Sequence, residues 1–177
     1  MELKFLESLQ LLHSPFLNYI MIFITKLGNG GFIWIIATIY LLFQNKNKLK
    51  REGFTIALAL IIFSVFGLLI LKPIIARPRP FTIDDVSILI KEPRDFSFPS
   101  GHTGSSFAAA YVMYFYNKKR GVLALILAGL IAFSRMYLFV HYPSDIIAGL
   151  ILGIISAYFA RKITKKILKI KNKITPP

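Results

Sequence analysis

A run of 19 residues without a charge, residues 53–71 (GFTIALALIIFSVFGLLIL), constrains this chain more than any other feature. At about 1.5 Å per residue, a helix of this length crosses a bilayer core of roughly 30 Å. Charged residues make up only 17% of the chain, whereas a soluble domain carries about 25%. The composition therefore excludes a soluble globule, and we expect residues 1–177 to form a single membrane domain.

Further apolar stretches recur along the chain with short basic loops between them. We expect an all-α integral membrane bundle of six transmembrane helices. Their approximate spans are 11–26, 27–44, 53–72, 101–116, 121–138 and 143–161.

Small residues repeat four positions apart in two of these spans. The two series are Ala124, Ala128 and Ala132, and Gly149, Gly153 and Ala157. Each series lies on one helix face and allows another backbone to approach closely. The alternative is chance in a sequence rich in Ala and Gly.

The formal net charge is +14, which favours an anionic partner. Basic clusters hold four Lys/Arg at 44–52, three at 117–120 and seven at 161–177. Because these clusters separate apolar runs, we expect contact with anionic membrane lipids and a phosphorylated substrate, and no nucleic acid. The positive-inside rule makes their side cytoplasmic. With six spans, both termini would then be cytoplasmic.

The absence of cysteine excludes disulfides, zinc–thiolate sites and a cysteine nucleophile. The longest loop, residues 73–100, carries the only acidic pair, Asp84 and Asp85. An acidic pair in a loop is usually a solvated surface, and no acidic cluster has the spacing of metal ligands.

Three cations, Lys72, Arg79 and Arg135, lie at the outer ends of the expected spans. Arginine and lysine donors bind phosphate oxygens. The alternative is snorkelling side chains that fix helix ends. Arg77 and Arg94 cannot be separated from that alternative.

Pro99-Ser100-Gly101-His102 precedes the fourth expected span. Ser100 is a suitable N-cap, Gly101 allows close backbone approach, and the free N–H groups of a helix start favour an anion. The alternative is an ordinary helix cap.

His141 lies four residues before Asp145, and Pro143 suits a first helical position. The carboxylate can then fix the tautomer of the histidine, which makes it a nucleophile or a base. The alternative is a surface histidine near a helix-start charge.

Together these segments resemble the type 2 phosphatidic acid phosphatase superfamily, which includes lipid phosphate phosphatases and vanadium-dependent haloperoxidases. The family pattern is K-x6-R-P, then P-S-G-H, then S-R-x5-H-x3-D. This sequence matches it at Lys72 to Pro80, Pro99 to His102, and Ser134 to Asp145.

The resemblance implies a role for each matching residue. His141 would attack phosphorus and form a phosphohistidine, Asp145 would orient it, and His102 would protonate the leaving oxygen and later activate water. The phosphate would be bound by Lys72, Arg79, Ser100, Gly101 and Arg135. Members of the family need no metal, so we expect no cofactor.

The resemblance favours a lipid phosphatase of the bacterial cytoplasmic membrane with its site facing outside and no obligatory protein partner. Undecaprenyl pyrophosphate is the favoured substrate. Phosphatidylglycerophosphate, phosphatidate and a lipid A phosphate remain open. Two other readings are a haloperoxidase, against which the membrane spans argue, and a non-enzymatic membrane scaffold, which would need neither histidine.

Overall fold

A computed structural model describes residues 1–84 and 86–174, with side chains up to residue 170. This part of the chain is helical and contains no strand, so the all-α prediction is confirmed. The helices are α1 (Glu2–Gln10), α2 (Pro15–Leu27), α3 (Phe32–Leu42), α4 (Asn47–Phe63), α5 (Lys72–Ile75), α6 (Gly101–Tyr116), α7 (Lys118–Tyr137) and α8 (Pro143–Ile174). Two short 3₁₀ segments, η1 (Asn29–Gly31) and η3 (Pro80–Thr82), and a π-helical segment, η2 (Ser64–Leu71), complete the order.

Local sequence sets the helix starts. The side chains of Ser14, Ser100 and Asn117 cap α2, α6 and α7 by accepting a backbone N–H from the first turn. Prolines at the first positions of α2 and α8, Pro15 and Pro143, begin those helices because a first-turn residue needs no N–H donor.

The two spans expected at 11–26 and 27–44 are joined end to end as one path. α2 and α3 meet at η1 with a bend of 44°, and together they are long and apolar enough to cross a membrane. The apolar pattern alone could not show this, because a four-residue break without charges reads equally well as a turn between two spans. In space the break bends the chain and does not reverse it.

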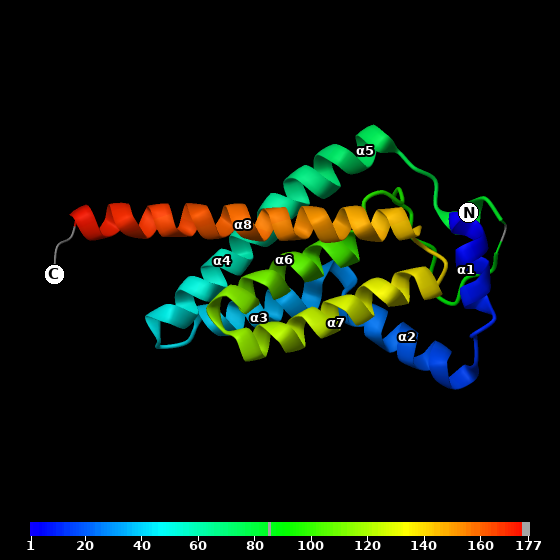
Figure 1. Ribbon diagram of the computed structural model, residues 1–177, viewed down its shortest axis with the longest axis horizontal. Helices are drawn as coiled ribbons and strands as arrows, with labels where there is room; N and C mark the ends of the chain where they lie inside the picture. The colour runs from blue at the N-terminus through cyan, green and yellow to red at the C-terminus, as the bar shows by residue number, and fades with distance from the viewer. Residues whose placement is uncertain (85, 175–177) are drawn as a thin grey trace.

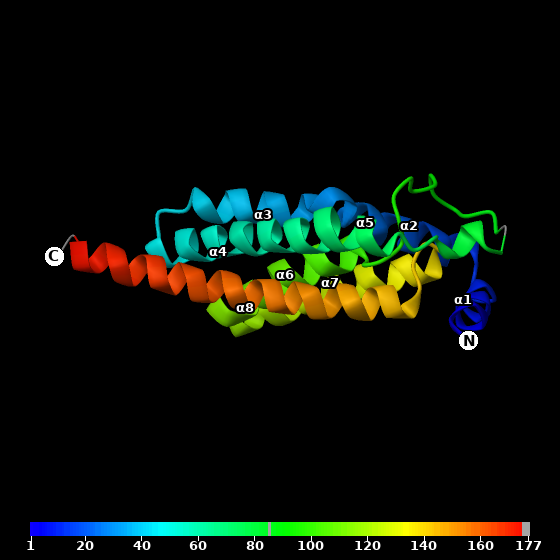
Figure 2. The ribbon, with the colours of Figure 1, turned by 90° about the horizontal axis from the view of Figure 1, so that it is seen from above.

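The remaining rods run back and forth beside this bent pair (Figure 1, Figure 2). α4, η2 and α5 form one continuous rod, and α6, α7 and α8 follow with alternating direction. Among the described residues, three helices are long and apolar enough to span a membrane: Asn47–Thr82, Lys118–Tyr137 and Pro143–Ile170. The bent α2–α3 pair is a fourth candidate span. The prediction of six spans is therefore not confirmed.

α1 and the last described turns of α8 lie at opposite ends of the bundle (Figure 1). Glu2 of α1 holds the amino terminus beside the start of α8, where its carboxylate accepts from Ser144 N–H at 2.8 Å and from Arg77 at 2.7 Å. α8 then runs away from this end for 32 residues. The expectation that both termini share one side stays a prediction, and it depends on whether the bent α2–α3 pair is one broken span.

α6 is the most enclosed helix and packs between α7 and α8. Ala108, Ala109 and Ala110 have no exposed surface. A Cβ on Gly149 would lie 2.8 Å from the carbonyl oxygen of Ser100, so α8 approaches α6 as closely as its glycines allow. The close packing expected from the small-residue series on α8 is thus confirmed.

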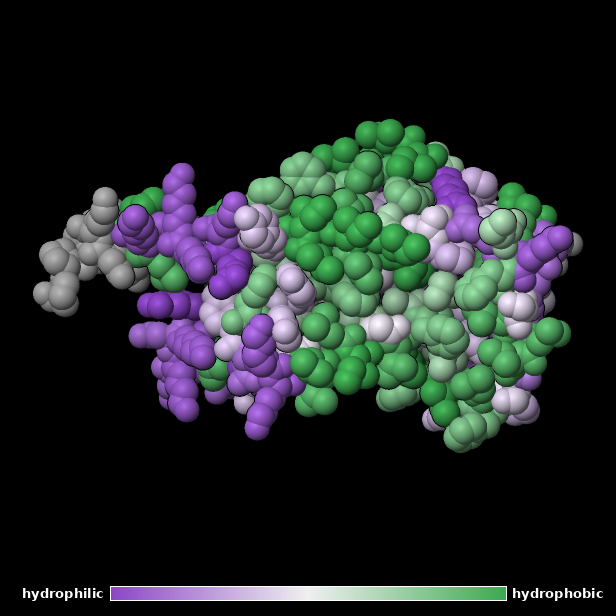
Figure 3. All heavy atoms as spheres, in the orientation of Figure 1, coloured by the Kyte–Doolittle hydropathy of each residue, from purple (hydrophilic) through white to green (hydrophobic). Residues whose placement is uncertain are grey.

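On the face seen in Figure 3, a broad apolar surface covers the middle of the bundle, and polar residues gather towards its two ends. Large side chains such as Ile36, Phe66, Leu69 and Leu123 are exposed there. Contact of so much apolar surface with water is unfavourable, whereas contact with lipid tails is favourable.

Candidate active site

Three cations from separate elements converge on one cavity. Lys72 begins α5, Arg79 lies in the following loop, and Arg135 lies in the last turn of α7. They are 7%, 4% and 3% exposed, and all three line a cavity of about 760 Å³. The structure brings together the three cations singled out in the sequence, and their binding of phosphate stays a prediction.

Asp95, in the loop before α6, orients two of these cations. Its carboxylate accepts from Lys72 Nζ at 2.8 Å and from Arg79 Nη2 at 2.7 Å, and its backbone oxygen accepts from Arg79 Nε at 2.8 Å. Partial burial alone would raise its pKa. The hydrogen bond and charge of Lys72, and then those of Arg79, outweigh burial and lower the pKa of Asp95 to about 2. Asp95 is therefore a permanent counter-charge that fixes the direction of both cations.

Arg135 is held differently. Its Nη1 donates to Thr25 Oγ1 of α2 at 2.6 Å, while its buried Nε has no hydrogen-bond partner in the described part of the chain. A buried guanidinium N–H without a partner is costly, and an anionic oxygen in the cavity would satisfy it.

His141 lies in a buried loop between α7 and α8. The turn passes through Phe139, whose φ of +59° is rare for a residue with a side chain. Close packing stabilises this unusual turn, because Leu138, Phe139 and Val140 are at most 1% exposed. The loop thereby fixes His141, which is 1% exposed, against the cations.

The environment of His141 keeps it neutral. Burial, and then the charges of Arg79, Arg135 and Lys72, lower the pKa of His141 well below its ordinary value. Its Nε2 lies 3.3 Å from Arg79 Nη1. Its Nδ1 lies 3.4 Å from Asp145 Oδ2, as the four-residue spacing predicted. A proton on Nδ1 leaves a lone pair on Nε2, on the side of the cations.

Asp145 is fully buried, and both of its carboxylate oxygens accept hydrogen bonds. Oδ2 accepts from Ser97 Oγ at 2.5 Å and from the backbone N–H of Tyr142 at 2.9 Å, and Oδ1 accepts from Arg77 at 2.8 Å. Ser97 Oγ is also 3.5 Å from His141 Nδ1. The carboxylate cannot rotate away from the histidine without losing these bonds.

The Pro99–His102 segment places its members differently. Gly101 and His102 line the cavity. Ser100 is fully buried, and its hydroxyl accepts from the N–H of Thr103 at 3.4 Å and the hydroxyl of Thr103 at 2.9 Å. In this structure Ser100 therefore acts as the cap of α6 and is not among the cavity-lining residues, so its predicted contact with phosphate is the least supported of the set.

Sequence reasoning missed several residues that hold the site in place. Arg77 bridges Asp145 and Glu2 and lies 3.7 Å from the centre of the Tyr142 ring, behind the cavity. Asn29 contacts His102 at 2.9 Å. The Gly-Asn-Gly-Gly break inside an apolar run was the available signal for Asn29, whereas no local pattern marks Arg77.

The outer loop contributes unevenly. Residues 89–93 line the cavity, whereas Asp84 and Arg94 do not, and Asp85 lies outside the described residues. Within those residues no group of His, Asp and Glu has the geometry of a metal site.

The cavity is lined by both polar and apolar side chains. Besides the cations and the two histidines, apolar residues come from the bent pair, from the α4–η2 rod and from the outer loop. They are Ile22, Ile35, Leu60, Leu68, Leu89 and Ile90. Such a lining can hold a ligand that has both a charged head group and a hydrocarbon tail.

Known proteins resemble this chain in sequence and in fold. The model of the family described as "PAP2 superfamily" matches residues 53–169. The undecaprenyl-diphosphatase of Sulfolobus acidocaldarius is 34% identical over 139 residues, which is 77% of this chain and 66% of that relative. Phosphatidylglycerophosphatase B of Bacillus subtilis is 31% identical over 177 residues, covering 92% of this chain and 83% of its own length.

Among solved structures, the crystal structure of Aquifex aeolicus LpxE superimposes with a TM-score of 0.78 at 27% identity. The alignment covers 91% of this chain and 94% of that chain. The likeness therefore extends into the region that precedes the matched residues 53–169.

Proposed function

The chain belongs to the PAP2 superfamily, and on that premise we propose that it is a lipid phosphatase that hydrolyses a membrane lipid phosphate or diphosphate through a phosphohistidine on His141. The observation that carries this proposal is the pairing at His141. Its Nδ1 lies beside the immobilised Asp145, and its Nε2 lies beside Arg79. This arrangement prepares a neutral imidazole for attack at the place where negative charge is bound.

In the proposed first step, the lone pair on His141 Nε2 forms a bond to phosphorus while the bond from phosphorus to the lipid oxygen breaks. His102 gives a proton to that leaving oxygen. In the second step, His102 takes a proton from water, the oxygen attacks phosphorus, and the P–N bond breaks to release phosphate.

The cations stabilise the charge of the transferring phosphoryl group in both steps, so the mechanism needs no metal. We propose that Lys72, Arg79, Arg135 and the backbone of Gly101 contact its oxygens. The unpartnered Nε of Arg135 supports this. The hydroxyl of Ser100 would have to leave its cap to take part.

We propose undecaprenyl diphosphate as the substrate, by analogy with the named activity of the Sulfolobus acidocaldarius relative. A phosphatidylglycerophosphate head group is the second candidate, by analogy with the Bacillus subtilis relative. Phosphate release from a panel of purified lipid phosphates and diphosphates, with and without EDTA, tests both. Release that requires added Mg²⁺ would overturn the metal-free mechanism, and no release from any lipid would overturn the function.

We propose that the site end faces outward, because the fourteen cations of the three basic clusters lie in segments at the opposite end. With one pass through α2 and α3, the amino terminus lies outside and the carboxyl terminus inside. The chain has no cysteine, so single cysteines are clean probes. Lys4→Cys and Glu92→Cys should react with an impermeant thiol reagent in intact cells, and Asn47→Cys should not. The reverse pattern would place the chemistry in the cytoplasm.

A further inference from the structure

The break between α2 and α3 lies against the proposed acid. Gly30 and Gly31 have φ of +57° and +71°, which glycine adopts without strain. A Cβ on Gly28 would lie 2.8 Å from Cδ2 of His102 and 2.8 Å from a methyl group of Ile131. A regular helix could not approach His102 in this way, so the break builds one wall of the site.

Asn29, in the middle of this break, binds His102 directly. Its Oδ1 accepts from His102 Nε2–H at 2.9 Å. This bond fixes the plane of the imidazole and leaves Nδ1 as the nitrogen whose protonation can change. Asn29 touches none of the three phosphate-binding cations by hydrogen bond, so any effect it has on the reaction passes through His102.

Lys26, in the last turn of α2, adds a fourth cation to the cavity. Lys72 and Arg79 are each paired with Asp95. The ammonium of Lys26 makes no hydrogen bond or ion pair to any part of the chain that the structure describes. The side chain of Lys26 is exposed, so its charge does not by itself require a partner, but its place in the cavity lining beside Asn29 allows the ammonium to bind an anion there.

We propose that the break is a subsite for the leaving group and that Lys26 makes the site prefer diphosphates, with Asn29 as a positioning residue for His102. This inference rests on the proposed function. His102 gives its proton to the leaving oxygen, so groups beside His102 face the leaving group. When a diphosphate reacts, that group is a lipid monophosphate, whose charge Lys26 binds. When an alkyl monophosphate reacts, it is an uncharged alcohol.

Two variants, Lys26→Met and Asn29→Ala, test the subsite. The two substrates, farnesyl diphosphate and farnesyl phosphate, have the same hydrocarbon tail and differ only in the head group. For Lys26→Met, we expect kcat/KM to fall by about 10- to 100-fold for the diphosphate, the range of a lost hydrogen bond to a charged group. The monophosphate should lose less than about 3-fold, since its leaving group bears no charge. Lys26→Arg should retain the preference.

Lys91→Met is the matched control, because Lys91 lines the same cavity from the outer loop. It should leave the ratio of the two substrates unchanged. A ratio that shifts as far for Lys91→Met as for Lys26→Met would show that overall cavity charge, and not a subsite, sets the preference.

Asn29→Ala should give the opposite pattern. The misplaced acid costs most when the leaving oxygen is a poor leaving group, so farnesyl phosphate should lose on the order of 10-fold or more while p-nitrophenyl phosphate changes little. Each variant keeps one activity, which shows that it folds. Equal losses on every substrate would overturn the inference. Absence of phosphate release by the unaltered protein would instead overturn the proposed function.

Discussion

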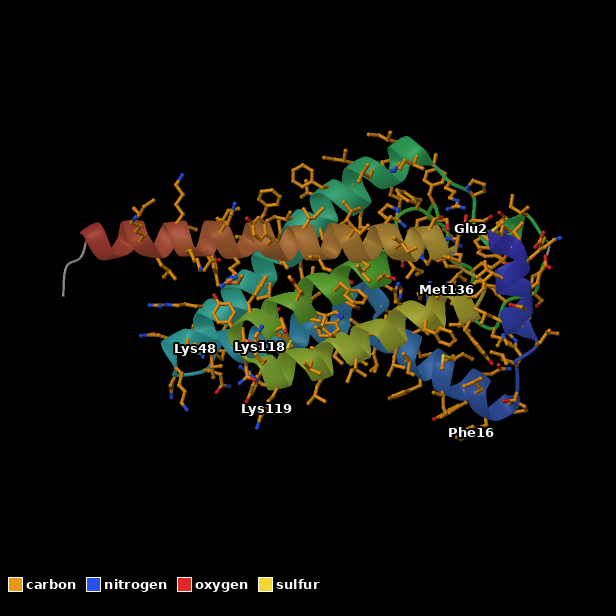
Figure 4. All side chains as sticks on the ribbon, in the orientation of Figure 1. Glu2, Phe16, Lys48, Lys118, Lys119 and Met136 are labelled. Carbon is orange, nitrogen blue, oxygen red and sulfur yellow. The ribbon has the colours of Figure 1, made fainter. Side chains whose placement is uncertain are left out.

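The two ends of the molecule hold their positive charges in opposite ways. At the site end, Lys72 and Arg79 are buried and their donors meet carboxylate and carbonyl oxygens. At the other end, Lys48, Lys118 and Lys119 extend into solvent (Figure 4). Burying a charge is costly unless partners compensate, so the buried cations of the site end are held in fixed directions by their partners.

This difference indicates that the number of cations and their exact positions have separate roles. For the exposed cluster only the number of Lys and Arg residues matters, because orientation in a membrane depends on how many of them flank the spans. In the proposed function the buried cluster binds phosphate, and that role needs donor atoms at particular positions, because phosphate recognition depends on donor geometry. Substitutions at the two ends should therefore have effects of very different size.

The largest effect should come from His141→Ala. It removes the group that we propose attacks phosphorus, so turnover should fall by on the order of 10⁴-fold or more for every substrate, as for other lost nucleophiles. No labelled protein should survive a rapid quench under alkaline conditions, where phosphohistidine is stable. Labelled protein in this variant would assign the nucleophile to another residue.

A smaller effect should come from Arg79→Lys, which keeps the positive charge but loses the planar guanidinium and its several N–H donors. The guanidinium donates through three nitrogens to Asp95 and to the carbonyl of Val140, and a single ammonium cannot reproduce this. We expect a loss of about 10²- to 10³-fold in kcat, similar to the removal of one preorganised donor. Steady-state kinetics on a lipid phosphate measures it. A change below about 3-fold would mean that charge alone suffices at the site end, as at the other end.

Arg120→Ala probes an exception within the basic end. Arg120 Nη2 donates at 2.9 Å to Glu52, whose side chain is fully buried, with Oε1 unpartnered in the described residues. Removing Arg120 leaves this carboxylate buried without its hydrogen-bonded counter-charge, and only the more distant charge of Lys48 still acts on it. Because Arg120 is 38% exposed, we expect a loss of about 2 kcal/mol in stability, less than for a fully buried pair. Turnover per folded molecule should be unchanged. Thermal unfolding in detergent and an activity assay measure the two quantities.

Much of this contrast could be predicted from the sequence, because local patterns specify it. The helices that begin at Gly101 and Pro143 start where the PSGH segment and the proline predicted. The spacing of His141 and Asp145 gave a contact that the structure has. Each of these features depends on residues within a few positions of one another.

The features that could not be predicted depend on residues far apart in the chain. Glu2 meets Ser144, and Asn29 meets His102, across more than seventy positions. Whether the break at η1 reverses the chain or only bends it depends on what packs against it. The count of spans and the side of the amino terminus both depend on that one bend, so six spans are not confirmed and the side of the amino terminus stays a prediction.

The smallest effect should come from the pair Lys118→Gln and Lys119→Gln at the start of α7. Both side chains are exposed and neither forms an ion pair with the described residues, although Lys118 Nζ lies 3.6 Å from the centre of the Tyr114 ring. An exposed cation–π contact is worth about 0.5–1 kcal/mol, so stability should change by no more than that. The kcat should stay within about 2-fold, since no atom of the cavity moves. Twelve cations still flank that end, so the labelling pattern of Lys4→Cys and Asn47→Cys should persist. A kcat loss comparable to that of Arg79→Lys would show that the two ends are coupled, and that the exposed cluster does more than orient the chain.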